Sequence, residues 1–212
     1  MKIHILPSGP ISTNAYLLTE SALNQAILID APGDIYAEIE PILATENCRL
    51  AELWITHGHW DHTQDAADII RQTAVPVIRA HEADQAMFEH PEIMSPYLDD
   101  SIHLKPFQVT HWMNQSDRFT ALNQPVEIRH VPGHCPGNIL FHLPDTRHAF
   151  VGDAIFNGSV GRTDLPGGSM SQLEESIRTQ IYTLPDSTQL FPGHGPVTTV
   201  SDEKNHNPYV RG

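Results

Sequence analysis

The chain has 212 residues, of which 40% are hydrophobic and 18% are charged, which is typical of a globular protein and allows one domain over 1–212. Its formal net charge of −14 opposes binding to a phosphate backbone, so we expect no nucleic-acid partner. No apolar run approaches the ~20 residues that span a bilayer, and the two cysteines form no Cys-x-x-Cys pair. We therefore expect no membrane association and a reducing, cytoplasmic setting.

The N-terminal half of the chain alternates between strand and helix patterns. Short apolar runs between turn residues predict strands at 1–7, 14–19, 25–30, 50–56 and 75–80. Amphipathic or helix-favouring segments predict helices at 35–44, 63–72 and 81–89. In the second of these helices Thr63 is a candidate cap and Asp65 lies in the first turn. Residues 91–106 show no clear periodicity, and we expect a loop there.

The C-terminal half has a similar alternation. Strands are predicted twice within 118–134, again at 138–143 and 148–156, and at the start of 188–195. A helix is predicted over 169–184, because Ser169 and Gln172 have capping-box spacing and the apolar residues form one stripe. This half-and-half order favours two sheets packed together with helices outside.

A cluster of ligand-type residues, in the sequence THGHWDH, comes at the end of the strand predicted at 50–56. Gly58 lets the backbone turn there, so a tight loop can direct four side chains at one point; these are His57, His59, Asp61 and His62. Neutral imidazole and carboxylate are ligands of zinc, iron and manganese. The spacing differs from the His-Glu-x-x-His of a zincin helix. Because one catalytic metal commonly uses three protein ligands, the alternatives are two metals, or one metal with supporting residues.

Three more ligand-type residues have the same setting. Each follows a strand-like run and directly follows a glycine; they are His134, Asp153 and His194. This shared setting would place them on one rim of the sheets, where functional loops gather.

These segments together resemble a known family. The motifs THGHWDH, PGHCPG, GDAIF and PGHG are similar to those of the metallo-β-lactamase fold, and the similarity extends from GPISTNAYLL to EKNHNPYV. It implies a four-layer αββα sandwich with a two-metal site on its rim. By residue-for-residue match, His57, His59 and His134 would bind one ion, Asp61, His62 and His194 would bind the other, and Asp153 would bridge them. The implied cofactors are two divalent transition-metal ions, with zinc favoured and iron or a zinc/iron pair as alternatives.

Within this superfamily, FNGSVGRTDLPGG and the short length resemble glyoxalase II-like (hydroxyacylglutathione hydrolase-like) enzymes without the C-terminal helical domain. Asn138 stands where the family often has His, and Ala31 interrupts the usual Asp-Pro-Gly near Asp30. The resemblance implies a binuclear hydrolase of a small anionic acyl thioester, with a metal-bound hydroxide as nucleophile. Its expected catalytic carboxylates are Asp61 and Asp153. Arg162 and Asp164 are candidates for contacting the substrate, or else form a salt bridge that fixes their loop.

The closest alternative is a persulfide dioxygenase, because those enzymes share the fold and a Gly-Arg-Thr-Asp loop. Their single iron would be held by His57, His134 and Asp153. The presence of Asp61, His62 and His194 favours two metals instead. Cys135 lies next to a ligand, but we expect it to fill space rather than to react. For the assembly, we expect a monomer or a homodimer.

Overall fold

The computed structural model describes residues 1–99 and 101–212 of the chain. Within these residues the chain separates into two compact units, Met1–Trp112 and Met113–Gly212. Each unit contains one six-stranded sheet, and the second unit also contains a two-stranded sheet. The expectation of a single domain over 1–212 stays a prediction.

The sheet of the first unit has the strand order β1-β2-β3-β4-β5-β6. Its strands are β1 (Lys2–Ser8), β2 (Thr13–Glu20), β3 (Gln25–Ile29), β4 (Arg49–Trp54), β5 (Val77–Ala80) and β6 (His111–Trp112). β1 to β3 are antiparallel neighbours, whereas β3 to β6 run parallel because the intervening segments return the chain to the same end of the sheet. The helices are α1 (Ile35–Glu46), α2 (Trp60–Thr63), α3 (Ala66–Thr73) and α4 (Gln85–Glu89), with the 3₁₀ segments η1 (Glu82–Asp84) and η2 (Pro91–Tyr97).

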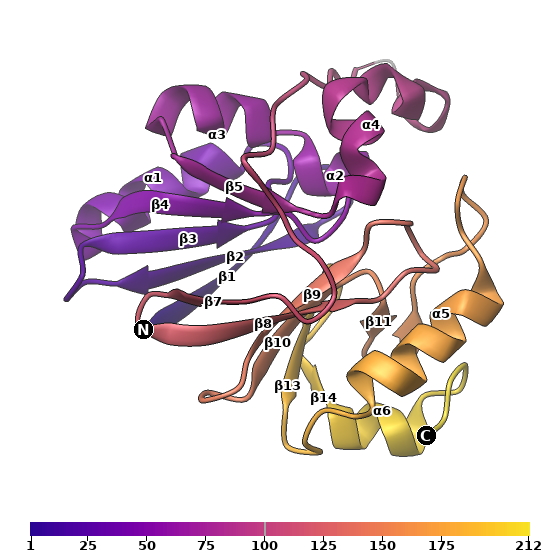
Figure 1. The fold of residues 1–212 in the computed structure, drawn as a ribbon. Coiled ribbons are helices and arrows are strands. Elements are labelled where there is room, and N and C mark those ends of the chain that lie inside the picture. Colours follow the sequence, from indigo (N-terminus) through magenta and orange to yellow (C-terminus); the bar gives the residue numbers. More distant parts are fainter. Residues whose placement is uncertain (100) are drawn as a thin grey trace. The chain divides into compact units, whose positions relative to one another are not determined.

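One face of this sheet is covered by α1 and α3 (Figure 1). The helix residues Ile35 and Ile69 are fully buried and share one core cluster with Leu28 of β3 and Leu53 of β4. Burial of such side chains stabilises a fold by about 1.5–3 kcal/mol each. The first unit therefore has a helix layer on a sheet layer, which leaves the carboxyl ends of β3 and β4 to carry loops.

The sheet of the second unit has the strand order β14-β13-β10-β9-β8-β7. Its strands are β7 (Arg118–Ala121), β8 (Gln124–His130), β9 (Ile139–Leu143), β10 (His148–Gly152), β13 (Gln189–Pro192) and β14 (Thr198–Thr199). β11 (Ile155–Phe156) and β12 (Ser159–Val160) form a separate hairpin. α5 (Met170–Ser176) continues into the π-helical turn η3 (Ile177–Ile181), and α6 (Val200–His206) follows β14.

A second core lies between this sheet and its helices. Leu140 and Val151 of the sheet are buried in one cluster with Leu173 of α5, Ile177 of η3 and Val200 of α6. The second unit, like the first, thus has one sheet layer and one helix layer, which are the layers expected in an αββα fold.

Three local features differ from the sequence-based expectations. α3 begins after Asp65, whereas Thr63 ends α2 and its hydroxyl donates to the carbonyl of His59, so the predicted Thr63 cap is wrong. Residues 91–106, expected as a loop, include the 3₁₀ segment η2. The helix α6 was not predicted, although Thr199 caps it by accepting a hydrogen bond from the amide of Asp202. The predicted cap of α5 is confirmed, because Ser169 accepts from the amide of Gln172.

No helix in the described parts of the chain, 1–99 and 101–212, is both long enough and apolar enough to cross a membrane.

β9 buries a histidine in the second unit. His142 is only 5% exposed and lies opposite Glu127 on β8 and Ala149 on β10. Desolvation, helped by the nearby positive charge of Arg129, lowers the pKa of His142 from 6.5 to about 4. The ring therefore stays neutral in the folded protein at a pH where the unfolded chain takes up a proton.

Replacing His142 with Leu should make the protein less sensitive to mild acid. Folding lowers the pKa of this histidine, so its contribution to the free energy of unfolding is fully present above about pH 6.5. That contribution is lost as the pH drops from there towards about 4. In urea unfolding of the metal-free protein, wild type should lose up to about 2 kcal/mol more between pH 7 and pH 5 than His142→Leu does. The exposed-site variant His103→Gln is the control and should lose as much as wild type. Equal losses for wild type and His142→Leu would contradict the assignment.

Candidate metal centre

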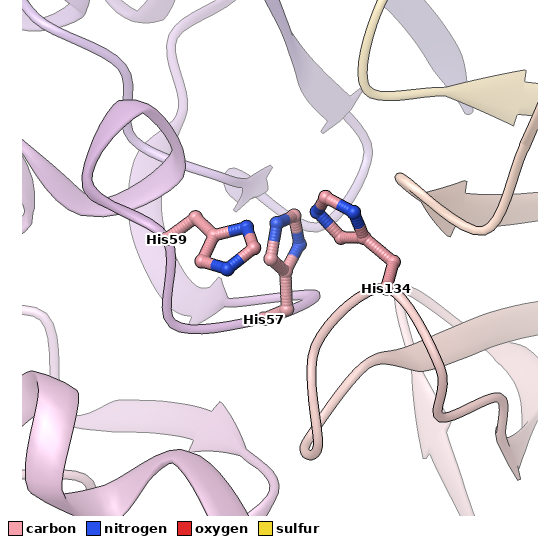
Figure 2. A group of neighbouring side chains, drawn as sticks. All are labelled: His57, His59 and His134. Carbon is pink, nitrogen blue, oxygen red and sulfur yellow. The ribbon is translucent and has the colours of Figure 1, made fainter. Parts of the chain in front are cut away.

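The first unit presents four ligand-type residues in the segment that follows β4. His57 and His59 lie on the loop between β4 and α2, whereas Asp61 and His62 lie in α2 itself. The side chains of His57 and His59 are drawn in Figure 2 on this loop. The ring centroids of His57 and His59 are 4.7 Å apart, and those of His57 and His62 are 4.1 Å apart. The four residues are 0–7% exposed, so imidazole and carboxylate groups are concentrated in one buried segment.

Gly58 allows this loop to pack closely against α4 and the preceding turn. A Cβ on Gly58 would lie 2.8 Å from the sulfur of Met87 and 3.0 Å from Cβ of Asp84. Gly58 does not have a positive φ, so the backbone turn expected from the sequence does not explain this glycine. The close approach of Met87 and Asp84 to its Cα explains it instead. The amide of Gly58 donates to the fully buried Asp84 carboxylate at 2.8 Å, which fixes the loop between His57 and His59.

A buried carboxylate at the end of β3 orients two of the histidines. Asp30 accepts hydrogen bonds from the amide and the hydroxyl of Thr56, both at 2.8 Å, and from Nδ1 of His62 at 2.8 Å. The single hydroxyl hydrogen of Thr56 is directed to Asp30, so its oxygen accepts from Nδ1 of His57 at 3.1 Å. Both rings therefore carry their proton on Nδ1 and keep the lone pair of Nε2 for a metal ion.

Asp61 lies beside His62 in the same unit. Oδ2 of Asp61 accepts a hydrogen bond from the hydroxyl of Thr13 at 2.7 Å and lies 3.3 Å from Nε2 of His62. One ligand atom of each of these two residues lies within 4.8 Å of the other, as do those of His57 and His59. These separations fit side chains that share metal ions, which bind nitrogen and oxygen ligands at about 2.0–2.2 Å.

The second unit carries its three ligand-type residues at one edge of its sheet. Asp153 follows β10 and His194 follows β13, and these strands are parallel neighbours. β8, which precedes His134, runs in the same direction as β10, because both are antiparallel to β9. The carboxyl ends of all three strands therefore lie at the same edge, as the shared setting of these residues predicts for this unit.

Within this set, Asp153 lies between the two histidines. Its Oδ2 is 3.6 Å from Nε2 of His134 and 3.5 Å from Nε2 of His194. Nδ1 of His134 is 2.7 Å from the carbonyl oxygen of Arg162. Since a carbonyl can only accept, Nδ1 of His134 donates, and its Nε2 keeps a lone pair on the side of Asp153. Figure 2 also draws the His134 ring on its own loop.

Arg162 contributes to this unit in two ways. Its backbone carbonyl holds His134, whereas its guanidinium makes two hydrogen bonds of 2.7 Å with the carboxylate of Asp164. The hydrogen bonds from Arg162 lower the pKa of Asp164 to about 2, and Asp164 in turn raises the pKa of Arg162. Both side chains are exposed, at 61% and 68%. The loop is thus held by an ion pair that a ligand from solvent can reach.

The ligand-type residues of each unit, taken by themselves, have the chemistry of transition-metal ligands. Five imidazoles and two carboxylates are the ligand types that zinc and iron accept, and three of the imidazoles have a fixed acceptor at Nδ1. Sequence reasoning missed the residues that hold the ligands in place; they are Thr13, Asp30 (noted only at a strand end), Thr56 and Asp84. A charged residue at the end of an apolar strand, as at Asp30, was the one available signal; a threonine such as Thr13 gives none.

Comparisons with known proteins agree with this chemistry. The family model described as the metallo-beta-lactamase superfamily matches residues 8–194. The chain is 34% identical over 212 residues to hydroxyacylglutathione hydrolase GloC of Haemophilus influenzae, covering 99% of this chain and 98% of that protein. It resembles the structure of the BLEG-1 B3 metallo-beta-lactamase with a TM-score of 0.91, 31% identity and 100% of both chains covered. It also resembles TTHA1623 in a di-iron-bound form, with a TM-score of 0.86, 30% identity, and coverage of 98% and 100%. The predicted fold class is thereby confirmed.

Replacing Asp30 with Asn should weaken metal binding although Asp30 is not itself an expected ligand. An amide at this position offers one acceptor oxygen where the carboxylate serves three donors, so His57 and His62 lose their fixed orientation. Zinc affinity, measured by competition with a chelator, should fall by about 10–100-fold. The control is Asp65→Asn, because Asp65 precedes the neighbouring α3 and its carboxylate accepts from the amide of Tyr36 and not from a residue of the ligand segment. Wild-type affinity in Asp30→Asn would contradict the orienting role.

Proposed function

The chain belongs to the metallo-beta-lactamase superfamily and is a metallo-hydrolase, and we propose that it hydrolyses a small anionic thioester of the hydroxyacylglutathione type. The observation that carries this proposal is the full-length similarity to a hydroxyacylglutathione hydrolase, in a chain that has the whole expected ligand set. A fold alone does not define a substrate, so the thioester is assigned by chemistry and tested by assay.

The proposed centre combines the ligands of both units. His57, His59 and His134 would hold one ion, Asp61, His62 and His194 would hold the other, and Asp153 would bridge them. The 3.5 and 3.6 Å separations of Asp153 from two histidine nitrogens support a bridging role. When bound, two such ions lower the pKa of water to ~7 and polarise a substrate carbonyl. Zinc is our first choice, and the di-iron form of a relative makes iron the alternative.

Two carboxylates would take part in the reaction through their own oxygens. The hydrogen bond from Thr13 fixes the orientation of the Asp61 carboxylate. Held in this way, Asp61 would both bind an ion and orient the proton of the attacking hydroxide. Asp153, between His134 and His194, would keep the two sets of ligands at a fixed spacing.

A thioester suits these residues because its leaving group needs little help. A thiol has a pKa of ~8.5 and departs readily as thiolate, so no strong general acid is required. Two divalent ions outweigh two carboxylate ligands, so the proposed centre would be locally positive on a chain with a net charge of −14. That charge contrast favours a small anionic substrate.

The exposed Arg162 is our candidate for contacting the anionic part of the substrate. Its side chain is 61% exposed and its guanidinium is held by Asp164, so the group is oriented and still accessible from solvent. Because the same residue holds His134 through its carbonyl, substrate contact and ligand position would be connected by one loop. The competing interpretation, a salt bridge that only fixes the loop, predicts that Arg162→Ala alters stability but leaves KM unchanged.

Removing a ligand of the second proposed ion should separate a two-metal hydrolase from a one-iron enzyme. Wild type reconstituted with zinc or iron should hold close to two ions per chain. Asp61→Ala and His194→Ala should each lower that number towards one and cut thioester hydrolysis by ~100-fold or more, since a Lewis acid contributes several kcal/mol. His57→Ala should be at least as damaging under either mechanism and serves as the control. Elemental analysis and assays with S-lactoylglutathione measure these outcomes.

A persulfide dioxygenase with one iron, suggested by the Gly161–Asp164 loop, predicts the opposite pattern. Asp61→Ala and His194→Ala would then stay folded with full metal content and activity. Wild type would consume oxygen with glutathione persulfide and leave thioesters intact. That combination of results would overturn the hydrolase proposal.

Replacing Cys135 with Ser should leave most of the hydrolytic rate. Cys135 is fully buried next to His134, and the proposed nucleophile is an activated water rather than a thiolate. A rate loss of ~100-fold or more, which is about 2.7 kcal/mol of barrier, at unchanged folding and metal content would show that the thiol takes part in the chemistry.

A further inference from the structure

The β11–β12 hairpin and the two residues that follow it lie beside all three ligand-type residues of the second unit. β11 begins two residues after Asp153, and the ring of Phe156 on this strand meets the ring of His194 edge-on, with centroids 5.8 Å apart. β12 leads directly into Gly161 and Arg162, whose carbonyl accepts from His134. A Cβ on Gly161 would collide with the carbonyl oxygen of Asp153 and lie 2.9 Å from Nδ1 of His134. The hairpin and the residues after it therefore lie in contact with, or directly next to, each of the three ligand-type residues.

The turn of the hairpin is bound by a carboxylate from the C-terminal helix. Gly158, which makes the turn with a φ of +69°, donates its amide hydrogen to both oxygens of Glu203, at 3.1 and 3.3 Å. Glu203 lies in α6 and is only 3% exposed. Its oxygens also accept from the hydroxyl of Thr198 at 2.6 Å and from Nδ2 of Asn207 at 2.8 Å. Three donors thus converge on one buried carboxylate, a set that a neutral amide with a single oxygen cannot satisfy.

Asn207 binds the hairpin a second time. Its Nδ2 donates to the carbonyl of Ser159 at 3.0 Å as well as to Glu203. Its Oδ1 accepts from the amides of Tyr209 and Val210, which holds the chain after α6 against the same network. Asn207 is fully buried. Gly158 in the turn and Ser159 in β12 are therefore tied to Glu203 of α6 and to Asn207 directly after it, 45 and 48 residues further along the sequence.

We propose that Glu203 and Asn207 are positioning residues of the metal centre, which align His134, Asp153 and His194 through the β11–β12 hairpin. Neither residue touches a ligand, so the effect passes through the backbone between Gly158 and Arg162. The inference rests on the proposed function only in that these three residues bind metal. Outer partners that orient ligands typically contribute 10–100-fold to metal affinity.

Glu203→Gln tests the proposal in the full-length protein. The variant should bind zinc at least ~10-fold more weakly in chelator competition. Its cobalt(II)-loaded form should show a changed visible absorption spectrum, because the ligands around the ion are misaligned. In the metal-free protein, amides of residues 155–160 should exchange hydrogen faster than in wild type. The second variant, Asn207→Asp, keeps the acceptor for Tyr209 and Val210 but places an oxygen against Ser159 and Glu203, and it should act in the same way.

Tyr182→Phe is the matched control for a simple loss of stability. The Tyr182 hydroxyl donates to the backbone carbonyls of Glu203 and Val210, so its removal weakens the packing of α6 without touching the hairpin. At a comparable drop in Tm, Tyr182→Phe should keep zinc affinity within ~2-fold and leave the cobalt spectrum unchanged. The proposal would be overturned if Tyr182→Phe and Glu203→Gln had equal effects on zinc affinity and the cobalt spectrum. It would also be overturned if Glu203→Gln and Asn207→Asp both bound zinc as tightly as wild type. These measurements use no substrate, so a protein that fails to hydrolyse thioesters leaves their result intact.

Discussion

The hydrogen bonds to the buried Asp30 carboxylate are the interactions on which the geometry of residues 57–62 in the first unit depends. Asp30 directly follows β3 and accepts hydrogen bonds from Thr56 and His62. By orienting the Thr56 hydroxyl, it also determines that the proton of His57 is on Nδ1. Burying an ionised carboxylate is costly unless donors surround it, and here the donors are the residues that must be oriented. One charged group thereby satisfies its own hydrogen bonds and leaves two imidazole nitrogens with lone pairs for a metal ion.

In the second unit, one backbone carbonyl and one glycine have the corresponding role. The carbonyl of Arg162 sets the proton of His134, and Gly161 allows the backbone beside it to approach Asp153. This arrangement depends on the hairpin being held in place, since a carbonyl can orient a ring only if its own peptide is fixed. His57 and His62 in the first unit and His134 in the second thus all carry their proton on Nδ1. A side-chain carboxylate brings this about in the first unit and a backbone carbonyl in the second.

The sequence points to the ligand-type residues more clearly than to the residues that orient them. His57, His59, Asp61 and His62 stand out because imidazole and carboxylate side chains are rare at such density, and the strands before them have clear apolar patterns. Thr13 and Asp84 could not be recognised in this way, because a threonine in a strand and an aspartate in a helical segment fit ordinary local structure. Their roles come from residues 48 and 26 positions away, Asp61 and Gly58, which local patterns do not encode. The sequence did not predict α6 because its seven residues are largely polar. Its connection to the hairpin follows only from the hydrogen bond between Gly158 and Glu203.

The glycines around the ligands differ in how strictly evolution must keep them. At Gly195 the backbone has a φ of +75°, but an added Cβ would meet no atom of the described residues within 4 Å. Asparagine, which tolerates this conformation, is therefore an accessible replacement there. At Gly161 the obstacle is a backbone oxygen of Asp153, which no change of rotamer can move aside. Substitution can thus be tolerated at Gly195, next to His194. Position 161, in contrast, accepts only glycine.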